Sequence, residues 1–204
     1  MSDSKLGEDY FYSNIGTASW YGKKFHLKKT ANGELFNMYE YTAAHKDLPF
    51  GTILKVTNVD NGQSILVRIN DRGPFIGNRI LDLSYWASIE IGNTGLSRVL
   101  IEGFIPGRIN VINNAAENYY FAYSINKPIA FINKADADII VYTRDFNEGM
   151  KMYKNYQLKH PDNISYLAIP SEQIMRKDKY AEKFYIVVID PRANKKIKEI
   201  VRNK

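Results

Sequence analysis

The sequence predicts a mainly β protein, with a small closed β-barrel in the first half and a small α+β module in the second. Three observations carry this prediction. Short strand-like apolar segments alternate with Gly- and Asn-rich turns through residues 16–104. One short helical segment interrupts them, and closure of such strands into a barrel removes exposed strand edges. After residue 105 the pattern changes to strands mixed with longer helical segments.

In the first half, the alternation of apolar and polar residues predicts strands at residues 17–21, 52–58, 64–69 and 96–104. Asp60-Asn61-Gly62 is a strong hairpin signal, so it is expected to join the second and third of these strands. Residues 81–84 (LDLS) are expected to open the helix. Either Asp82 or Ser84 would cap that helix, and Gly92 would end it.

The second half is expected to hold an amphipathic helix at residues 146–158, a terminal helix from Pro191, and strands at residues 119–124, 138–143, 164–169 and 184–189. Pro, Gly and Asn pairs just after residue 105 indicate a linker. The predicted organisation is an N-terminal tail, a barrel domain, a linker and an α+β module, at residues 1–15, 16–105, 106–117 and 118–204.

The composition excludes several kinds of site. Hydrophobic residues make up 45% and charged residues 25%, as in globular proteins, and no apolar run is long enough to cross a bilayer. There is no cysteine, so disulfides and thiolate chemistry are excluded, and three scattered histidines predict neither metal nor cofactor. Most of the net charge of +6 falls in residues 105–204. That excess favours an anionic polymer such as a cell-wall glycan, a membrane surface, or simply a solvated face, and no nucleic-acid motif accompanies it.

Polar residues gather where the third strand ends. Val67 and Ile69 alternate with polar neighbours, and turn residues follow them directly. Asp71 is therefore expected at a strand end, held by a rigid scaffold and open to a ligand. The alternative is a structural Asx-turn with salt-bridged arginines. The arginines that would hold Asp71 ionised, or bind a substrate anion, are Arg68, Arg72 and Arg79.

Ordered motifs run through residues 16–104: GTASWYG, TANGE, TAAHK, LPFGT, NDRGPF and DLS. Together they resemble the rare lipoprotein A family, whose domain is a double-psi β-barrel. The resemblance implies an endolytic peptidoglycan lytic transglycosylase that acts on denuded glycan strands. Such a lyase cleaves the MurNAc–GlcNAc β-1,4 bond with a 1,6-anhydro product, in cell-wall remodelling or daughter-cell separation.

By the same resemblance, the catalytic residues are Asp71 of NDRGPF, Glu34 of TANGE and His45 of TAAH. His45 is alternatively a core histidine satisfied by backbone groups. Barrels of expansins and family 45 endoglucanases use the aspartate of a DLS-like motif, here Asp82, which is alternatively the helix cap. Substrate contacts are expected from Trp20, Tyr21, Asn70, Arg72, Arg79 and Asp82, with a core role as the alternative for Trp20.

The chemistry needs these residue types. Cleavage of a glycosidic bond requires a proton for the leaving oxygen and stabilisation of an oxocarbenium-like transition state. A carboxylic acid holds that proton near neutral pH only if burial or a nearby like charge raises its pKa. Glu34 would supply such a charge if the barrel brings it beside Asp71. One acid that later serves as the base is sufficient, because the C6 hydroxyl of the sugar replaces water.

Two other functions stay open. One is a non-catalytic glycan binder that works as expansins do, and the other is a structural partner of envelope or division-machinery proteins. The order of elements in the second module is similar to that of a sporulation-related repeat, which binds denuded glycan. The family's substrate implies export to the periplasm or cell envelope. Membrane attachment through an N-terminal lipid, whose acceptor cysteine is not in this sequence, is a further expectation.

Overall fold

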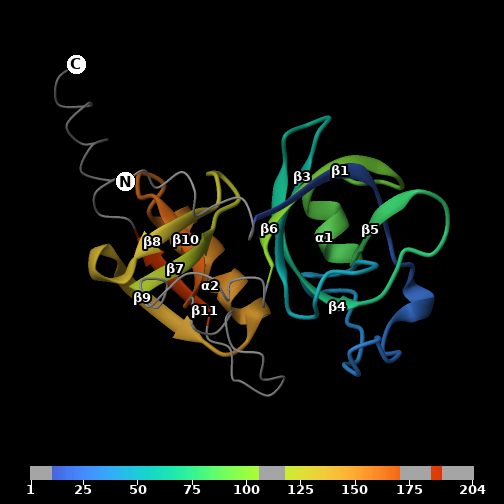
Figure 1. Ribbon diagram of the computed structural model, residues 1–204, viewed down its shortest axis with the longest axis horizontal. Coiled ribbons are helices and arrows are strands. Elements are labelled where there is room, and N and C mark those ends of the chain that lie inside the picture. Colours follow the sequence, from blue (N-terminus) through green and yellow to red (C-terminus); the bar gives the residue numbers. More distant parts are fainter. Residues whose placement is uncertain (1–10, 106–117, 171–184, 190–204) are drawn as a thin grey trace. The chain divides into compact units, whose positions relative to one another are not determined.

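The computed structural model describes residues 11–105, 118–170 and 185–189 of the chain (Figure 1). The chain separates into two compact units, residues 1–108 and residues 109–204. In the described residues the first unit is a closed β-barrel, and the second is an antiparallel sheet with a helix packed against it. The predicted fold class, a mainly β chain with a barrel followed by an α+β module, is confirmed.

The barrel strands are β1 (Phe11–Trp20), β2 (Thr42–Ala44), β3 (Ile53–Asn58), β4 (Ser64–Asp71), β5 (Arg79–Leu83) and β6 (Ser97–Phe104). They pair in the order β1-β5-β2-β4-β3-β6 and close on themselves. The β1/β5 and β2/β4 pairs run parallel, and the other pairs run antiparallel. The core is formed by fully buried apolar side chains, which include Leu54, Val56, Ile65, Leu66 and Ile101.

The predicted hairpin joins β3 to β4. Gly62 has a φ of +73°, a left-handed conformation that glycine adopts without strain, and its N–H donates to the carbonyl of Asn58 at 2.8 Å. The helix α1 (Tyr85–Glu90) is present as well, and its cap is Ser84, whose hydroxyl accepts from the N–H of Ala87 at 3.2 Å. Asp82 is not the cap, because residues 81–83 belong to β5.

Three strands differ from the sequence prediction. β1 begins at Phe11, because residues 11–16 pair with β6, so the barrel extends into the predicted tail. β2 and β5 were not predicted as strands, and they pair with each other and with β4 and β1. These pairings join segments that are far apart in the chain, and therefore no local pattern signals them.

The second unit contains β7 (Tyr119–Tyr123), β8 (Ala130–Asn133), β9 (Asp138–Thr143), α2 (Phe146–Lys159), β10 (Ser165–Pro170) and β11 (Tyr185–Ile189). Its strands form one antiparallel sheet in the order β8-β7-β10-β11-β9, in which β8 was not predicted. Asp145 caps α2, which packs against β9, β10 and β11 through buried side chains such as Phe146 and Met150. The predicted linker and the helix from Pro191 lie outside the described residues.

Candidate active site

A cavity of about 510 Å³ lies in the barrel unit. β1 contributes Ser19 and Trp20 to its wall, the end of β4 contributes Asp71, and β5 contributes Arg79 and Asp82. β1 and β5 are parallel neighbours in the sheet, so residues sixty positions apart in the chain meet at one place. The turn residues after Asp71 end the strand and leave its carboxylate at the cavity surface.

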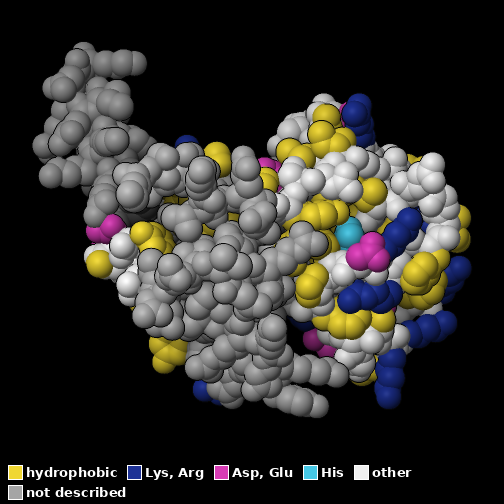
Figure 2. Space-filling view, viewed as in Figure 1, with side chains coloured by type: hydrophobic (Ala, Val, Ile, Leu, Met, Phe, Trp, Pro, Cys, Tyr) yellow, Lys and Arg dark blue, Asp and Glu magenta, His cyan; other side chains and the backbone are white. Residues whose placement is uncertain are grey.

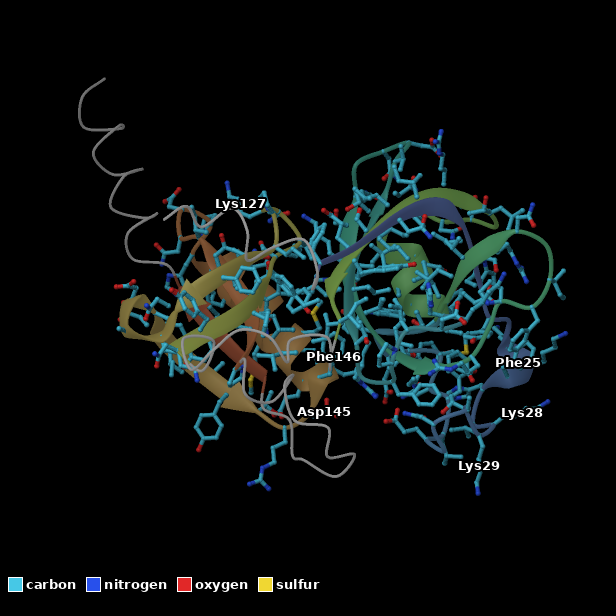
Figure 3. The ribbon with its side chains drawn as sticks, in the orientation of Figure 1. Phe25, Lys28, Lys29, Lys127, Asp145 and Phe146 are labelled. Carbon is cyan, nitrogen blue, oxygen red and sulfur yellow. The ribbon has the colours of Figure 1, made fainter. Side chains whose placement is uncertain are left out.

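Basic and aromatic side chains form one edge of this cavity. Lys24 and Lys28 place their Nζ atoms 5.1 Å and 5.9 Å from the centre of the Phe25 ring, within the range of cation–π contacts. Figure 3 shows Phe25, Lys28 and Lys29 along one edge of the barrel unit, and Figure 2 shows Lys and Arg side chains gathered over the same edge. Lys24, Lys28 and Lys29 are all exposed, so this edge offers positive charge to solvent.

The two oxygens of the Asp71 carboxylate have different partners. Oδ1 accepts from two backbone N–H groups, those of Ala31 and Arg72, each at 2.8 Å. Oδ2 accepts from the hydroxyl of Tyr21 at 3.1 Å. A backbone N–H can only donate, whereas a hydroxyl can rotate and either donate or accept. Oδ2 is therefore the oxygen that can carry a proton without losing a hydrogen bond.

Tyr21 is held firmly beside this carboxylate. Its ring makes edge contacts with Phe25 and Phe36, at centroid distances of 5.6 Å and 5.1 Å. Burial of the hydroxyl, and then the negative charge of Asp71, raise the pKa of Tyr21 far above its usual value of 10. Tyr21 therefore keeps its proton throughout the pH range in which proteins are stable. It is a permanent neutral hydroxyl facing Asp71.

Asp82 is the second carboxylate of the cavity, and it is only 9% exposed. Its Oδ1 accepts a hydrogen bond from the hydroxyl of Ser19. Arg79 donates from Nη1 to the same Ser19 hydroxyl at 2.7 Å, and that nitrogen lies 3.9 Å from Asp82 Oδ1. Asp82 thus sits in a fixed cluster with a cation beside it, whereas Asp71 is bound by neutral donors.

Glu34 is not among the residues that line the cavity. Its carboxylate forms a two-pronged ion pair with Arg68, at 2.9 Å and 2.8 Å, and also accepts from Asn70 Nδ2 at 3.2 Å. Partial burial acts to raise the pKa of Glu34, but Arg68 and the amides of Asn70 and Asn32 outweigh burial and lower the pKa. Glu34 is thus an ionised anchor of the turn that follows Thr30.

This turn connects Glu34 to Asp71 through the backbone. The N–H of Thr30 donates to the carbonyl of Glu34 at 2.8 Å, and the N–H of Ala31 donates to Asp71 Oδ1. Glu34 holds the far side of the turn on β4 through Arg68. The ion pair therefore fixes the position of one of the two backbone donors on Asp71.

His45 also lies outside the residues that line the cavity, and it is 6% exposed. Its Nδ1 accepts from the N–H groups of Asp47 and Leu48, both at 3.1 Å, and its Nε2 lies 3.2 Å from the hydroxyl of Tyr12. Two donors at Nδ1 require the neutral tautomer with its proton on Nε2. Burial lowers the pKa of His45, which also favours the neutral ring. Its backbone N–H donates to the carbonyl of Asp71 at 3.3 Å.

The expected substrate-binding residues divide into two groups. Trp20, Tyr21, Arg72, Arg79 and Asp82 line the cavity together with Asp71. Within this wall the Arg72 guanidinium lies 3.7 Å from the centre of the Phe50 ring and donates to the carbonyl of Leu48 at 2.9 Å, so it fastens the loop after β2. Asn70 does not line the cavity; it is buried and bonds to Glu34. The structure thus brings six of the nine predicted residues into the cavity wall, and Glu34, His45 and Asn70 are outside its lining.

Several groups that line the cavity or contact Asp71 were not predicted from the sequence. Ser19 stands next to Trp20 in a quoted motif, and its place in the strand was the available signal. Phe25 and the neighbouring Lys24 and Lys28 belong to a segment whose sequence indicates only a basic loop. The N–H of Ala31 carries no side-chain signal at all. Among the described residues, no group of three or more His, Cys, Asp or Glu side chains is placed to hold a metal ion, and no helix is long and apolar enough to span a membrane.

Comparison with known proteins gives consistent results for the barrel unit. Residues 13–109 match the family model described as "Lytic transglycolase". The chain is similar to proteins named endolytic peptidoglycan transglycosylase RlpA, with 50% identity over 110 residues in Pseudomonas aeruginosa and 57% over 103 residues in Helicobacter pylori. These matches cover 50% and 48% of this chain and 32% of each relative. The chain thus spans about a third of the length of the curated relatives it matches.

Two solved structures match this chain with low scores. A Streptomyces papain inhibitor matches with a TM-score of 0.37 and 19% identity, over 46% of this chain and 94% of the inhibitor. An expansin of Clavibacter michiganensis matches with a TM-score of 0.36 and 12% identity, over 86% of this chain and 78% of the expansin. Both TM-scores are too low to support a conclusion. The sequence match is the stronger finding: residues 13–109 are similar to the lytic transglycolase family model and to the proteins named RlpA.

Proposed function

We propose that this chain is an endolytic peptidoglycan lytic transglycosylase, which cleaves the MurNAc–GlcNAc β-1,4 bond of denuded glycan strands and leaves a 1,6-anhydro end. The observation that carries the proposal is the Asp71 carboxylate at the cavity wall, with Oδ1 bound by two backbone donors and Oδ2 facing a rotatable hydroxyl. This arrangement gives one carboxyl group a fixed position and one oxygen free to exchange a proton. The names of the similar proteins agree with this chemistry.

In the proposed reaction Asp71 acts first as acid and then as base. Oδ2 gives its proton to the bridging oxygen, the bond from that oxygen to C1 of MurNAc breaks, and positive charge develops on the sugar ring. The C6 hydroxyl of the same sugar then bonds to C1, and its proton passes to Oδ2. The acid is restored, the 1,6-anhydro ring is closed, and no water is consumed.

Other cavity residues support this cycle. When Asp71 is ionised, the Tyr21 hydroxyl donates to Oδ2, and when Asp71 is protonated the hydroxyl turns to accept. Asp82 places a second carboxylate in the same cavity, where negative charge stabilises an oxocarbenium-like transition state. Trp20 offers an aromatic face for a sugar ring.

Glu34 and His45 act in this proposal as positioning residues. Glu34 holds the turn that presents the N–H of Ala31 to Asp71, and His45 fixes the loop after β2, which contacts the Asp71 backbone. Neither needs to exchange a proton with the substrate. This division of roles fits the ionised state of Glu34 and the neutral state of His45, which follow from the directions of their pKa shifts.

The setting of the reaction is part of the same proposal. Peptidoglycan lies in the cell envelope, so the chain would work in the periplasm or at the envelope, with lipid attachment and division-machinery proteins as further partners. The second unit would bind glycan. This part of the proposal is supported by a cavity of about 580 Å³ in the second unit. Its wall includes the hydroxyl and amide groups of Ser124, Asn126, Gln157 and Asn163, which are of the kind that bind sugar hydroxyls.

The test is product analysis. The purified chain is incubated with denuded glycan strands, and the soluble products are examined by mass spectrometry. The proposal predicts 1,6-anhydro ends. Ordinary reducing ends would instead identify a hydrolase, and binding of glycan without soluble product would identify a glycan binder of the expansin kind.

A further inference from the structure

A series of aromatic contacts leads out of the cavity along the barrel surface. The Trp20 ring, in the cavity wall, lies 5.4 Å from the ring of Tyr85 in α1. Tyr85 lies 6.4 Å from Tyr39, and Tyr39 lies 6.4 Å from Trp86, all measured between ring centres. We call these four side chains the aromatic strip. Its first member belongs to the cavity and its last members lie on α1 and on the segment before β2.

The strip is exposed at the end farthest from the cavity in this series of contacts. Tyr39 is 55% exposed and Trp86 is 41% exposed, whereas Trp20 and Tyr85 are half-buried. Large aromatic side chains contribute most to stability when they are buried, so their clustering in contact with water is more typical of a binding surface than of a core. The barrel core is filled without Tyr39 and Trp86, mostly by aliphatic side chains.

The strip is held in place by hydrogen bonds. The backbone N–H of Trp86 donates to the carbonyl of Met38 at 3.0 Å, and its indole Nε1 lies 3.3 Å from the Tyr41 hydroxyl. The N–H of Tyr39 donates to Asn37 Oδ1 at 3.1 Å, and the ring of His26 lies 5.8 Å from the Tyr39 ring. Binding to side chains already held in position costs little ordering entropy.

We propose that the aromatic strip binds sugar units of the glycan strand beyond the pair whose bond is cut, and so favours long strands over short fragments. This inference rests on the proposed function. Two observations select a glycan as the occupant. The strip continues directly from the cavity through Trp20, and its exposed aromatic rings match the apolar C–H faces of sugars, while tyrosine hydroxyls at its edge match sugar hydroxyls.

The helix that carries part of the strip lacks the charges of a membrane-binding helix. Glu90 lies at the end of α1 and accepts from the Tyr41 hydroxyl at 2.9 Å, and α1 carries no basic residue in its last turn. Helices that bind anionic membrane surfaces present lysines and arginines beside their apolar face. Lys24 and Lys28, which lie around Phe25, line the cavity itself.

The experiment measures binding in an inactive background, so that it does not depend on cleavage. Full-length chain carrying Asp71→Asn is titrated with denuded glycan strands and with a denuded tetrasaccharide, and dissociation constants are measured by calorimetry. Adding Tyr39→Ala or Trp86→Ala is expected to weaken binding of long strands about three- to tenfold and to leave tetrasaccharide binding unchanged. Tyr142→Ala, at an exposed tyrosine of the second unit, is the matched control and leaves both unchanged.

Each outcome bears on the proposal. Tyr39→Phe keeps the ring and loses only the hydroxyl, and it is expected to bind long strands as the parent does, which assigns the effect to ring stacking. Unchanged tetrasaccharide binding in the alanine variants excludes loss of fold. The proposal is overturned if Tyr39→Ala and Trp86→Ala bind long strands as tightly as the Asp71→Asn parent does. It is also overturned if these substitutions change only the self-association of the chain, measured by sedimentation. If the chain with Asp71 intact yields no anhydro product while these substitutions still weaken binding, the proposed function fails and the strip remains a glycan site.

Discussion

At the scale of single residues, the asymmetry of the Asp71 carboxylate has the most direct chemical consequence. Oδ1 has two backbone donors, whose hydrogens cannot be redirected, and Oδ2 has one hydroxyl donor. Hydrogen bonds to an ionised group are worth about 1.5–3 kcal/mol, more than those between neutral groups. The Tyr21 hydroxyl therefore influences the position and stability of the Asp71 carboxylate, although it does not itself ionise at working pH.

Tyr21→Phe tests this influence. The ring and its contacts with Phe25 and Phe36 remain, and only the donor to Oδ2 is lost. Without that donor the carboxylate loses one of its three hydrogen bonds, so we expect kcat/KM for anhydro-product release to fall about three- to tenfold. The rate is measured for the parent and the variant on the same denuded strands. A parental rate in the variant would show that the hydroxyl has no part in the proton cycle.

Glu34→Gln tests the anchor of the turn that contacts Asp71, the proposed acid and base. The pKa of Glu34 is lower in the folded chain than its ordinary value of 4.5, so the ion pair with Arg68 stabilises the fold above that value. Its contribution is lost as pH falls through the folded-state pKa. The Glu34 side chain is 42% exposed, so water screens the pair and the cost at pH 7 is about 0.5–1 kcal/mol.

Urea unfolding at a series of pH values measures this effect. The difference in free energy of unfolding between the parent and Glu34→Gln should shrink as the pH falls through the folded-state pKa of Glu34. Asp60→Asn, on the exposed β3–β4 hairpin, is the control. A difference that stays the same at every pH would contradict an ion-pair anchor.

At the scale of elements, the close approach of β6 to β3 depends on a glycine. A Cβ atom added at Gly103 would lie 2.5 Å from the carbonyl oxygen of Ile53 and 2.9 Å from a methyl carbon of Leu54. The oxygen belongs to the backbone of a paired strand and cannot rotate away. Closure of the barrel therefore requires glycine at this position.

Gly103→Ala is expected to lower the free energy of unfolding by about 1–3 kcal/mol, as other overpacking substitutions do. Gly95→Ala is the control, because no atom lies within 4 Å of its added Cβ. Both are measured by chemical unfolding. Equal stability of the two variants would show that β3 separates from β6 at little cost.

The elements that the sequence predicts are those with local signals. Asp60-Asn61-Gly62 forms its hairpin because the turn chemistry acts within a few residues, and Ser84 caps α1 for the same reason. β5 has no such signal, because its stability comes from parallel pairing with β1. Asp82, in a segment that resembles a helix start, consequently lies in a strand and faces the cavity.

The candidate site was likewise predictable only where the signal is local in the sequence. The turn residues after β4 predict an open position for Asp71, and Asp71 lines the cavity. Asp82, Arg79 and Trp20, which were predicted from the motifs, line the same cavity. Whether Glu34 and His45 entered the cavity could not be predicted, because it depends on which partner each side chain meets in three dimensions. Arg68 holds Glu34, and two backbone N–H groups hold the His45 ring.

At the scale of the whole molecule, charge is distributed to favour an anionic substrate. The chain carries a net charge of +6, and exposed lysines stand at the rim of the cavity near Phe25. A denuded glycan strand keeps a free lactyl carboxylate on each MurNAc. Such a field raises the rate of encounter with an anionic polymer and is screened by salt.

Lys28→Gln with Lys29→Gln is expected to lower kcat/KM on denuded strands about three- to tenfold at low salt, and much less at about 0.5 M salt. Lys151→Gln with Lys159→Gln, on exposed positions of α2, removes the same charge from the second unit and serves as the control. An equal loss in both double variants would assign the effect to net charge alone. A loss that persists unchanged at high salt would indicate direct contacts in place of steering.

The most direct measurement compares anhydro-product release by the parent chain, Asp71→Asn and Asp82→Asn on the same denuded strands. Loss of the acid and base group predicts a fall of about 10²–10⁴-fold for Asp71→Asn, with its fold retained. Asp82→Asn keeps the acid and base group, so its rate of anhydro-product release is expected to fall by only about tenfold. Near-parental activity in Asp71→Asn, together with an inactive Asp82→Asn, would contradict the account and move the catalytic acid to β5.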